Sequence, residues 1–177
     1  MQDKKAIEIL KEAILLEHRG FSFYDNIATN TKSEAVKKVF KMMALEEVSH
    51  IKFLRRHLKN YEKLQTFLSR EEQNYPAPEV TEILTDEIKK EITAASYEAA
   101  AITAAIELED KAIKVYADRA GEATDPNEKA LYEWLVEWEK GHYKMLVDLH
   151  NELTKQIWDD NNFWYNDPSQ LGPGLDI

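Results

Sequence analysis

The feature that most constrains this sequence is an internal repeat of acidic and histidine residues without insertions. Each half contributes one glutamate and then a Glu-x-x-His motif, and a tyrosine follows the first glutamate by seven residues. The matching residues, each pair separated by 92 positions, are Glu17 and Glu109, Tyr24 and Tyr116, Glu47 and Glu139, and His50 and His142. A repeat of this kind predicts two copies of one helical hairpin.

Apolar residues recur with helical spacing in four stretches. Together with cap signals such as Asp125-Pro126, they predict helices at about 3–28, 33–60, 96–120 and 126–157. Only five glycines and five prolines interrupt the chain, so we expect an all-α fold. Residues 61–95 are too many for a hairpin turn, and they predict one long crossover that includes a short helix at 79–92.

After residue 157 the helical pattern stops, and large aromatic residues become frequent. We therefore predict a bundle domain at 1–157 and a tail at 158–177 that carries Trp158, Phe163, Trp164 and Tyr165. An exposed tail of this composition would be an apolar patch of a kind that soluble proteins rarely tolerate. We expect it to dock on its own bundle or on a partner subunit of a homodimer or higher homo-oligomer, near Trp134 and Trp138.

Composition excludes several classes of function. The net charge of −10 argues against nucleic acid and anionic lipid as partners. Long uncharged apolar runs are absent, so we expect no membrane span, and the charged amino terminus lacks a signal-peptide core, so we expect a cytoplasmic protein. The chain has no cysteine, so a metal within it must be held by carboxylates and imidazoles.

The repeated motif has the spacing that a metal site needs. Residues three apart on a helix are separated by about 60° of rotation and one turn, so one ion can bind both. Two such hairpins place four carboxylates and two imidazoles around two ions, the ligand set of di-iron and di-manganese bundles. Two divalent cations would also cancel the charge of four buried carboxylates. The metal ligands predicted are Glu17, Glu47, His50, Glu109, Glu139 and His142.

On these motifs the sequence resembles the rubrerythrin-like branch of the ferritin-like superfamily, over about residues 6–153. The resemblance implies a ferritin-like four-helix bundle with one long crossover between helices two and three, and two iron ions, with manganese as the alternative. It also implies that Tyr24 and Tyr116, our candidate catalytic pair, donate hydrogen bonds to metal-bound carboxylates; ordinary core packing is the other interpretation. The sequence departs from the family at Ala112, where a carboxylate is usual, and lacks a cysteine-ligated rubredoxin domain.

We expect a redox enzyme that reduces peroxide or dioxygen with electrons from a separate donor protein. A ferroxidase for iron storage, an oxygenase acting on an organic substrate and a non-catalytic metal-binding module are the alternatives. Gly20 and Ala112 are also 92 positions apart, and they either leave room for the oxidant or allow close helix packing. Glu46 is expected to point away from the site, and His57 to be a satisfied core or surface histidine.

Overall fold

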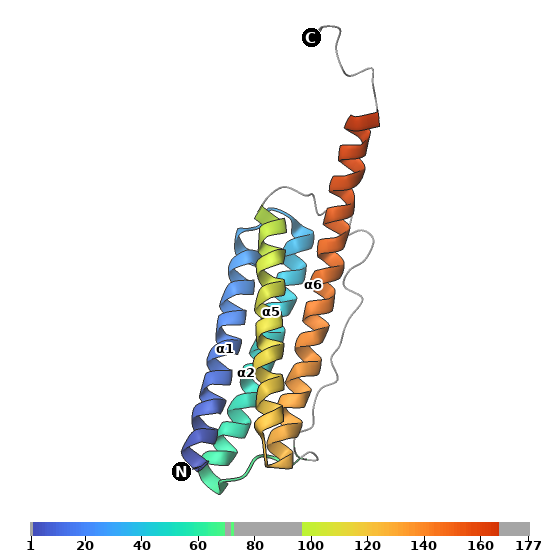
Figure 1. Ribbon diagram of the computed structural model, residues 1–177. Coiled ribbons are helices and arrows are strands. Elements are labelled where there is room, and N and C mark those ends of the chain that lie inside the picture. The colour runs from blue at the N-terminus through green and yellow to red at the C-terminus, as the bar shows by residue number, and fades with distance from the viewer. Residues whose placement is uncertain (1, 70–71, 73–96, 167–177) are drawn as a thin grey trace, which may run out of the picture.

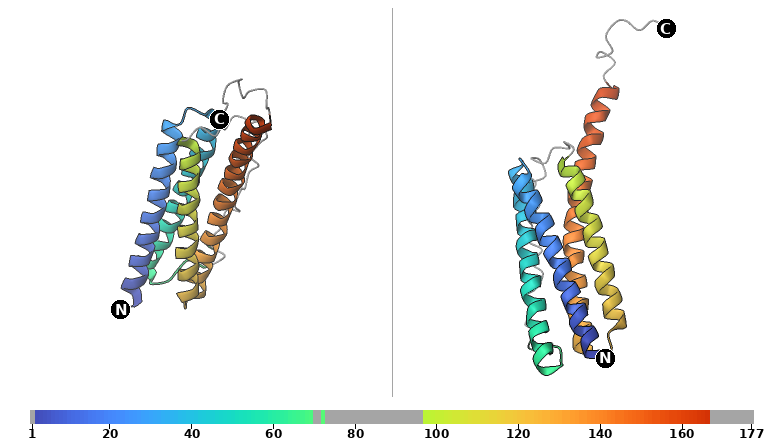
Figure 2. Two further views of the ribbon diagram at one scale, coloured as in Figure 1. Left: turned by 45° about the horizontal axis from the view of Figure 1, so that its top comes forward. Right: turned by 90° about the vertical axis from the view of Figure 1, so that its left-hand side faces the viewer.

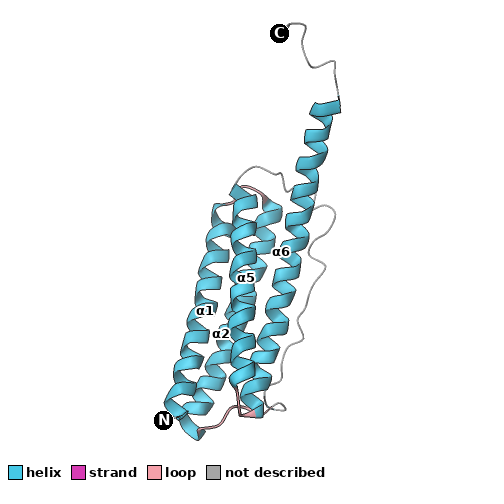
Figure 3. Ribbon diagram, viewed as in Figure 1, coloured by secondary structure: helices cyan, strands magenta, loops and turns pink. Residues whose placement is uncertain are grey.

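The computed structural model describes the backbone of residues 2–69, 72 and 97–166, and this part of the chain contains four helices and no strand (Figures 1 and 3). The prediction of an all-α four-helix bundle is confirmed. None of the described helices has both the length and the apolar character needed to cross a membrane. The helices are α1 (Gln2–Asn30), α2 (Glu34–Leu64), α5 (Tyr97–Glu122) and α6 (Pro126–Asn166).

The bundle consists of two antiparallel hairpins. Helix α1 packs along α2, and α5 packs along α6. The views in Figure 2 show that α2 and α5 run in the same direction, so the chain between them must return from one end of the bundle to the other. Most of that connection, including the predicted helix at 79–92, lies outside the described residues.

Side chains and backbone at the helix ends explain where the hairpins turn. The Ser33 hydroxyl oxygen accepts a hydrogen bond from the Val36 amide at 3.2 Å and caps the start of α2. Gln65 ends α2 in the left-handed conformation, with φ of 55°, and its amide donates to the Tyr61 carbonyl. Asp125 caps α6 by accepting from the Asn127 amide at 2.7 Å, directly before Pro126 at the first helical position.

Helix α6 is longer than the sequence pattern predicts. It continues to Asn166, so the prediction that helical structure ends near residue 157 is wrong. With 41 residues it is about 60 Å long at the usual helical rise, and Figure 1 shows it projecting past the ends of the other three helices. The contacts of Trp158, Phe163, Trp164 and Tyr165, and hence the predicted docking of the tail, lie outside the described side chains.

The interior has three layers along the bundle axis. One apolar cluster occupies the end that holds the α1–α2 turn, and it includes Tyr24, Phe40 and Leu146. The other occupies the opposite end and includes Leu10, Tyr116 and Leu135. Along every helix, the predicted metal ligands fall between the residues of these two clusters. A buried polar layer therefore separates two apolar cores.

His57 lies in the second apolar cluster, one layer away from the metal ligands. Its ring packs edge-on against Phe53 at 4.9 Å, and neither ring nitrogen has a hydrogen-bond partner. The residue is fully buried, as a core histidine would be, but it is not hydrogen-bonded as we expected. Burial, assisted by the Arg56 charge, lowers its pKa to about 4.

This buried histidine predicts acid-sensitive stability. The folded state keeps His57 neutral down to about pH 4, whereas the unfolded chain binds a proton near pH 6.5, so the stability present above pH 6.5 is lost as pH falls towards 4. Between pH 7.5 and pH 5 the loss is about 2 kcal/mol. Urea unfolding of metal-free His57→Leu should show a correspondingly smaller pH dependence than the parent protein. Equal pH dependence of the two proteins would contradict this assignment.

Candidate metal centre

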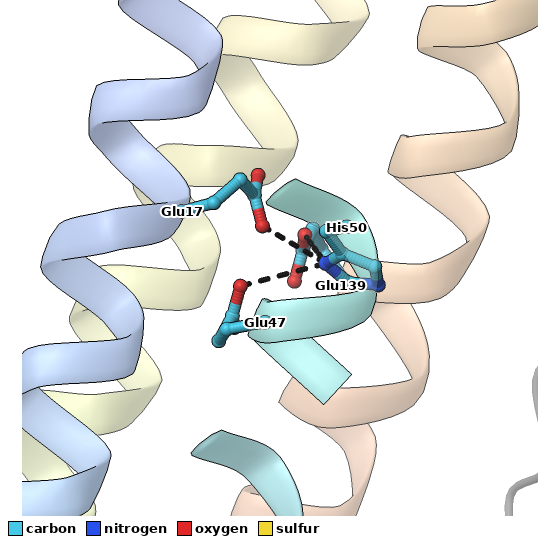
Figure 4. Close-up of side chains that lie close together, drawn as sticks. All are labelled: Glu17, Glu47, His50 and Glu139. Atoms are coloured by element: carbon cyan, nitrogen blue, oxygen red, sulfur yellow. Dashed lines mark hydrogen bonds and ion pairs between the residues drawn. The ribbon is translucent and has the colours of Figure 1, made fainter. Parts of the chain in front are cut away.

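The structure brings all six predicted ligands together at the middle of the bundle. One glutamate comes from each of α1 and α5, and a Glu-x-x-His pair comes from each of α2 and α6. None of the six is more than 4% exposed. Figure 4 shows four of them, with the Glu17, Glu47 and Glu139 carboxylates converging on the His50 ring. The shared helical phase of the repeat therefore directs every ligand inwards.

The first half of the site is built around His50 on α2. Its Nδ1 atom lies 2.9 Å from Oε2 of Glu17 and 3.4 Å from an oxygen of each of Glu47 and Glu139. These contacts join three helices, since Glu17 belongs to α1 and Glu139 to α6. Nδ1 is thus the ring nitrogen that faces the carboxylates.

The second half is built around His142 on α6 with the same geometry. Its Nδ1 atom lies 3.2 Å from Oε2 of Glu139 and 3.3 Å from Oε1 of Glu109. Oε1 of Glu47 is more distant, at 3.8 Å. The two imidazole rings lie side by side, with 5.9 Å between their centroids and 27° between their planes.

The six residues form two overlapping groups, each of which could hold one metal ion. Within each group the candidate ligand atoms lie within 4.8 Å of one another. The first group is Glu17, Glu47, His50 and Glu139, and the second is Glu47, Glu109, Glu139 and His142. Glu47 and Glu139 belong to both groups, so each would contribute to holding both ions.

Buried atoms without hydrogen bonds indicate that the ligand set fits a metal pair. Both carboxylate oxygens of Glu139 and the Nδ1 atom of His142 are buried without a hydrogen bond and make only ion-pair contacts, 3.2 Å between the two groups and 3.4 Å from Glu139 to His50. An unpaired buried polar group is costly, and a buried charge more so. A cation between these atoms would satisfy all three, and oxygen and nitrogen donors without sulfur suit iron or manganese.

Two tyrosines connect the hairpins directly beside the cluster. The Tyr24 hydroxyl on α1 donates to Oε1 of Glu109 on α5, and the Tyr116 hydroxyl on α5 donates to Oε1 of Glu17 on α1. Both tyrosines are fully buried. The predicted hydrogen bonds to carboxylates are therefore present, and the Tyr116 bond leaves Oε2 of Glu17 directed towards His50.

Burial and neighbouring charges shift the pKa values of glutamates and histidines in this network. Burial raises the pKa of Glu47 well above 4.5 and that of Glu109 to about 7, and the Glu139 carboxylate adds to both shifts. For Glu139, burial is outweighed by the two imidazoles, so its pKa falls. The carboxylates likewise outweigh burial and raise the pKa of both histidines.

These shifts determine which groups hold protons in the metal-free centre. Burial and the facing carboxylates raise the pKa of Tyr24 and Tyr116 well above 10.0, so both hydroxyls remain protonated donors. The raised pKa values of Glu47 and of the histidines mean that protons occupy part of the cluster. Metal binding would displace those protons, because ligands bind metal in their deprotonated form.

A small pocket reaches the cluster between α1 and α5. Its volume is about 10 Å³, and its lining includes Gly20, Ala112 and the Glu17, Glu47, Glu109 and Glu139 carboxylates. That volume is roughly what one water molecule needs. Gly20 also permits close approach, because a Cβ atom there would lie 3.1 Å from Cδ of Glu47. Both small residues therefore line the pocket, and Gly20 also packs closely against a candidate ligand.

Sequence reasoning missed one contact of the centre, that of Glu46. Its Oε2 atom lies 2.6 Å from Nε2 of His142, so the expectation that Glu46 points away from the site is wrong. Trp138, the residue 92 positions later, packs edge-on against His50 with 5.1 Å between ring centroids. Trp134 packs on Trp138 at the same distance, so both indoles lie beside the centre.

The contact between Gly20 and Glu47 predicts the effect of one methyl group. In Gly20→Ala the new Cβ would push the Glu47 carboxylate by a few tenths of an ångström, and because Glu47 belongs to both ligand groups, metal affinity should fall several-fold. The metal affinity is measured by calorimetric titration of the metal-free protein with Mn²⁺. Gly121→Ala is the control, since it is also a glycine-to-alanine change within a helix and its Cβ would meet no atom within 4 Å. Equal Mn²⁺ affinity in Gly20→Ala and the parent would refute the steric argument.

Comparison with known proteins agrees with this geometry. The sequence model of the Rubrerythrin family matches residues 8–150, which include all six ligands and both tyrosines. No curated protein and no solved structure matches the chain. The match covers most of the 177 residues, and it spans the four-helix bundle with its two carboxylate and histidine groups. The chain belongs to the rubrerythrin family.

Proposed function

We propose that this chain is a di-iron oxidoreductase that reduces hydrogen peroxide or dioxygen. The observation that carries the proposal is the pocket of about 10 Å³ lined by carboxylates of both ligand groups. It leaves space of roughly one water molecule beside the residues that would hold two metal ions, which favours a two-atom oxidant over a larger substrate. Family membership and the carboxylate and imidazole donor set support iron as the metal.

Six side chains would hold the metal pair. Bound there, two iron ions would supply the two electrons that reduce hydrogen peroxide, with two protons, to two water molecules. Glu47 and Glu139 would hold both ions, Glu17 and His50 would complete one position, and Glu109 and His142 would complete the other. The tyrosine hydroxyls fix the orientation of Glu17 and Glu109, and each keeps a proton beside the carboxylate oxygen that it contacts.

The electrons must be replaced from outside these 177 residues. The sequence has no cysteine, so it contains no cysteine-ligated iron centre that could pass electrons to the metal pair. The proposal therefore includes a separate one-electron donor protein as a partner. That partner would supply two electrons for each peroxide that is reduced.

Pocket size favours a small oxidant over an organic substrate. The ligand-lined pocket holds about 10 Å³, whereas sites for drug-sized organic ligands enclose roughly 300–1,000 Å³. A larger cavity of about 270 Å³, lined by Lys5, Tyr61 and Arg119 among others, includes none of the six ligands. An oxygenase would need a cavity of that kind at the metal pair.

The proposal predicts two metal ions per chain. Iron-loaded, desalted protein should contain two by elemental analysis, and Glu139→Ala should contain at most one because it loses a ligand of both groups. Glu133→Ala is the control on the same helix, because its side chain is 60% exposed. One ion or none in the parent protein would refute the di-metal centre.

The proposal also predicts that metal stabilises the fold. At a free concentration a few hundred times its dissociation constant, metal should raise the free energy of unfolding by about 3–4 kcal/mol.

The choice of oxidant is tested by rapid mixing. Protein loaded anaerobically with ferrous iron should oxidise much faster with hydrogen peroxide than with dioxygen in parallel stopped-flow experiments. Ala112→Val narrows the ligand-lined pocket and should slow this step without lowering iron content, whereas Ala117→Val, on the exposed face of α5, should not. A faster reaction with dioxygen, followed by accumulation of ferric mineral, would favour a ferroxidase instead.

A further inference from the structure

The two halves of the metal centre differ at one repeat position that contacts the imidazoles. Glu46 on α2 and Trp138 on α6 are 92 positions apart, and each directly precedes the glutamate of its Glu-x-x-His motif. Each contacts the histidine of the other hairpin: Glu46 contacts His142, and Trp138 contacts His50. One imidazole therefore faces a carboxylate where its counterpart faces an indole.

The Glu46 carboxylate determines how His142 presents itself to a metal. The distance from its Oε2 to Nε2 of His142 is 2.6 Å, the length of a strong charge-assisted hydrogen bond. An ionised carboxylate can only accept, so Nε2 carries the hydrogen and Nδ1 is the nitrogen left for the metal. Such a partner fixes the ring and makes the bound nitrogen a better donor to a cation.

His50 has no comparable partner. Its Nε2 atom is buried without a hydrogen-bond partner, and its ring is packed edge-on by Trp138 at 5.1 Å and by Trp134 at 5.7 Å. An indole ring offers at most a weak acceptor through its π face. The ring is held in place by packing, but nothing increases the electron density at its metal-facing nitrogen.

The tyrosine bonds to the ligands are matched between the halves. Tyr24 bonds Glu109 and Tyr116 bonds Glu17 in the same way, and Glu47 and Glu139 are shared by both groups. The tyrosines therefore do not favour either position. The difference between the two metal positions comes from the imidazoles, and thus from Glu46 and Trp138.

We propose that the two metal positions are inequivalent. The position of Glu47, Glu109, Glu139 and His142 fills first and retains its ion, while the position of Glu17, Glu47, His50 and Glu139 binds more weakly and exchanges its ion. Glu46 is the positioning residue that creates the difference. This inference rests on the proposed metal pair, and it adds a one-metal state in which only the His142 position is occupied.

Metal titration tests the proposal without any turnover. Calorimetry of metal-free protein with Mn²⁺ should resolve two binding steps whose affinities differ by roughly 10–100-fold. Glu46→Gln, which keeps the shape of the side chain and removes its charge, should weaken the first step by a similar factor and merge the two. Glu137→Gln is the matched control, because it removes the same charge from a side chain that is 67% exposed and that, within the described part of the chain, forms an ion pair with surface Lys140.

The outcomes separate this inference from the metal centre itself. Two ions bound with equal affinity by the parent protein, or two steps that remain separate in Glu46→Gln, would overturn the inequivalence and leave the di-metal centre intact. Fewer than two ions would overturn both. If Glu46→Gln fails to fold, the proposal can still be tested on the parent protein alone. Mössbauer spectra with one ferrous ⁵⁷Fe per chain should show one dominant quadrupole doublet, and two doublets of equal area would contradict the proposal.

Discussion

The structure depends on the burial of four carboxylates in one layer of a helical bundle. Each carboxylate is at most 3% exposed, and two apolar clusters exclude water above and below them. Removing a carboxylate from water costs several kcal/mol unless charge and hydrogen bonds compensate. In this chain the compensation comes from the two histidines, the two tyrosines and displaceable protons. The site and the fold therefore cannot be considered separately.

The tyrosine hydrogen bonds show how this layer holds the hairpins together. Most packing occurs within each hairpin, α1 with α2 and α5 with α6. Tyr24 and Tyr116 reach across from α1 to α5 and from α5 to α1, and each ends on a ligand of the opposite hairpin. A shift of one hairpin against the other would break both bonds and separate the ligand groups. The polar layer thereby fixes the register between hairpins, which apolar packing alone specifies less sharply.

The sequence was sufficient to predict which six side chains gather in the buried polar layer, because the inward direction of each depends on helical phase alone. Once Glu17 and Tyr24 share a face of one helix, the repeat places Glu109 and Tyr116 identically, and the Glu-x-x-His spacing does the same for the other pair of helices. Glu46 could not be found this way. Its contact with His142 depends on how α2 and α6 pack side by side, which the residue spacing within one helix does not contain.

The end of α6 was misjudged for a different reason. Residues 158–166 include four aromatic residues and several Asp and Asn, which are weak helix formers, but neither proline nor glycine interrupts them. The first strong breaker is Pro168, and α6 ends at Asn166. Loss of amphipathic periodicity marks where a helix stops facing the core, and it does not mark where the helix stops.

The lack of a hydrogen-bond partner for His57 could not be predicted from the sequence either, since it depends on the surrounding Phe53 and Phe67 rings.

The covalent linkage of the two hairpins gives this chain a freedom that a symmetric assembly lacks. In a homodimer of single hairpins every residue would occur twice at equivalent positions, so an acid beside one imidazole would require the same acid beside the other. Within one chain the repeated positions vary independently, and Glu46 and Trp138 have diverged while the ligands around them have remained identical in type. Joining the hairpins thus allows two chemically distinct metal environments to be built from a single duplicated pattern of ligands.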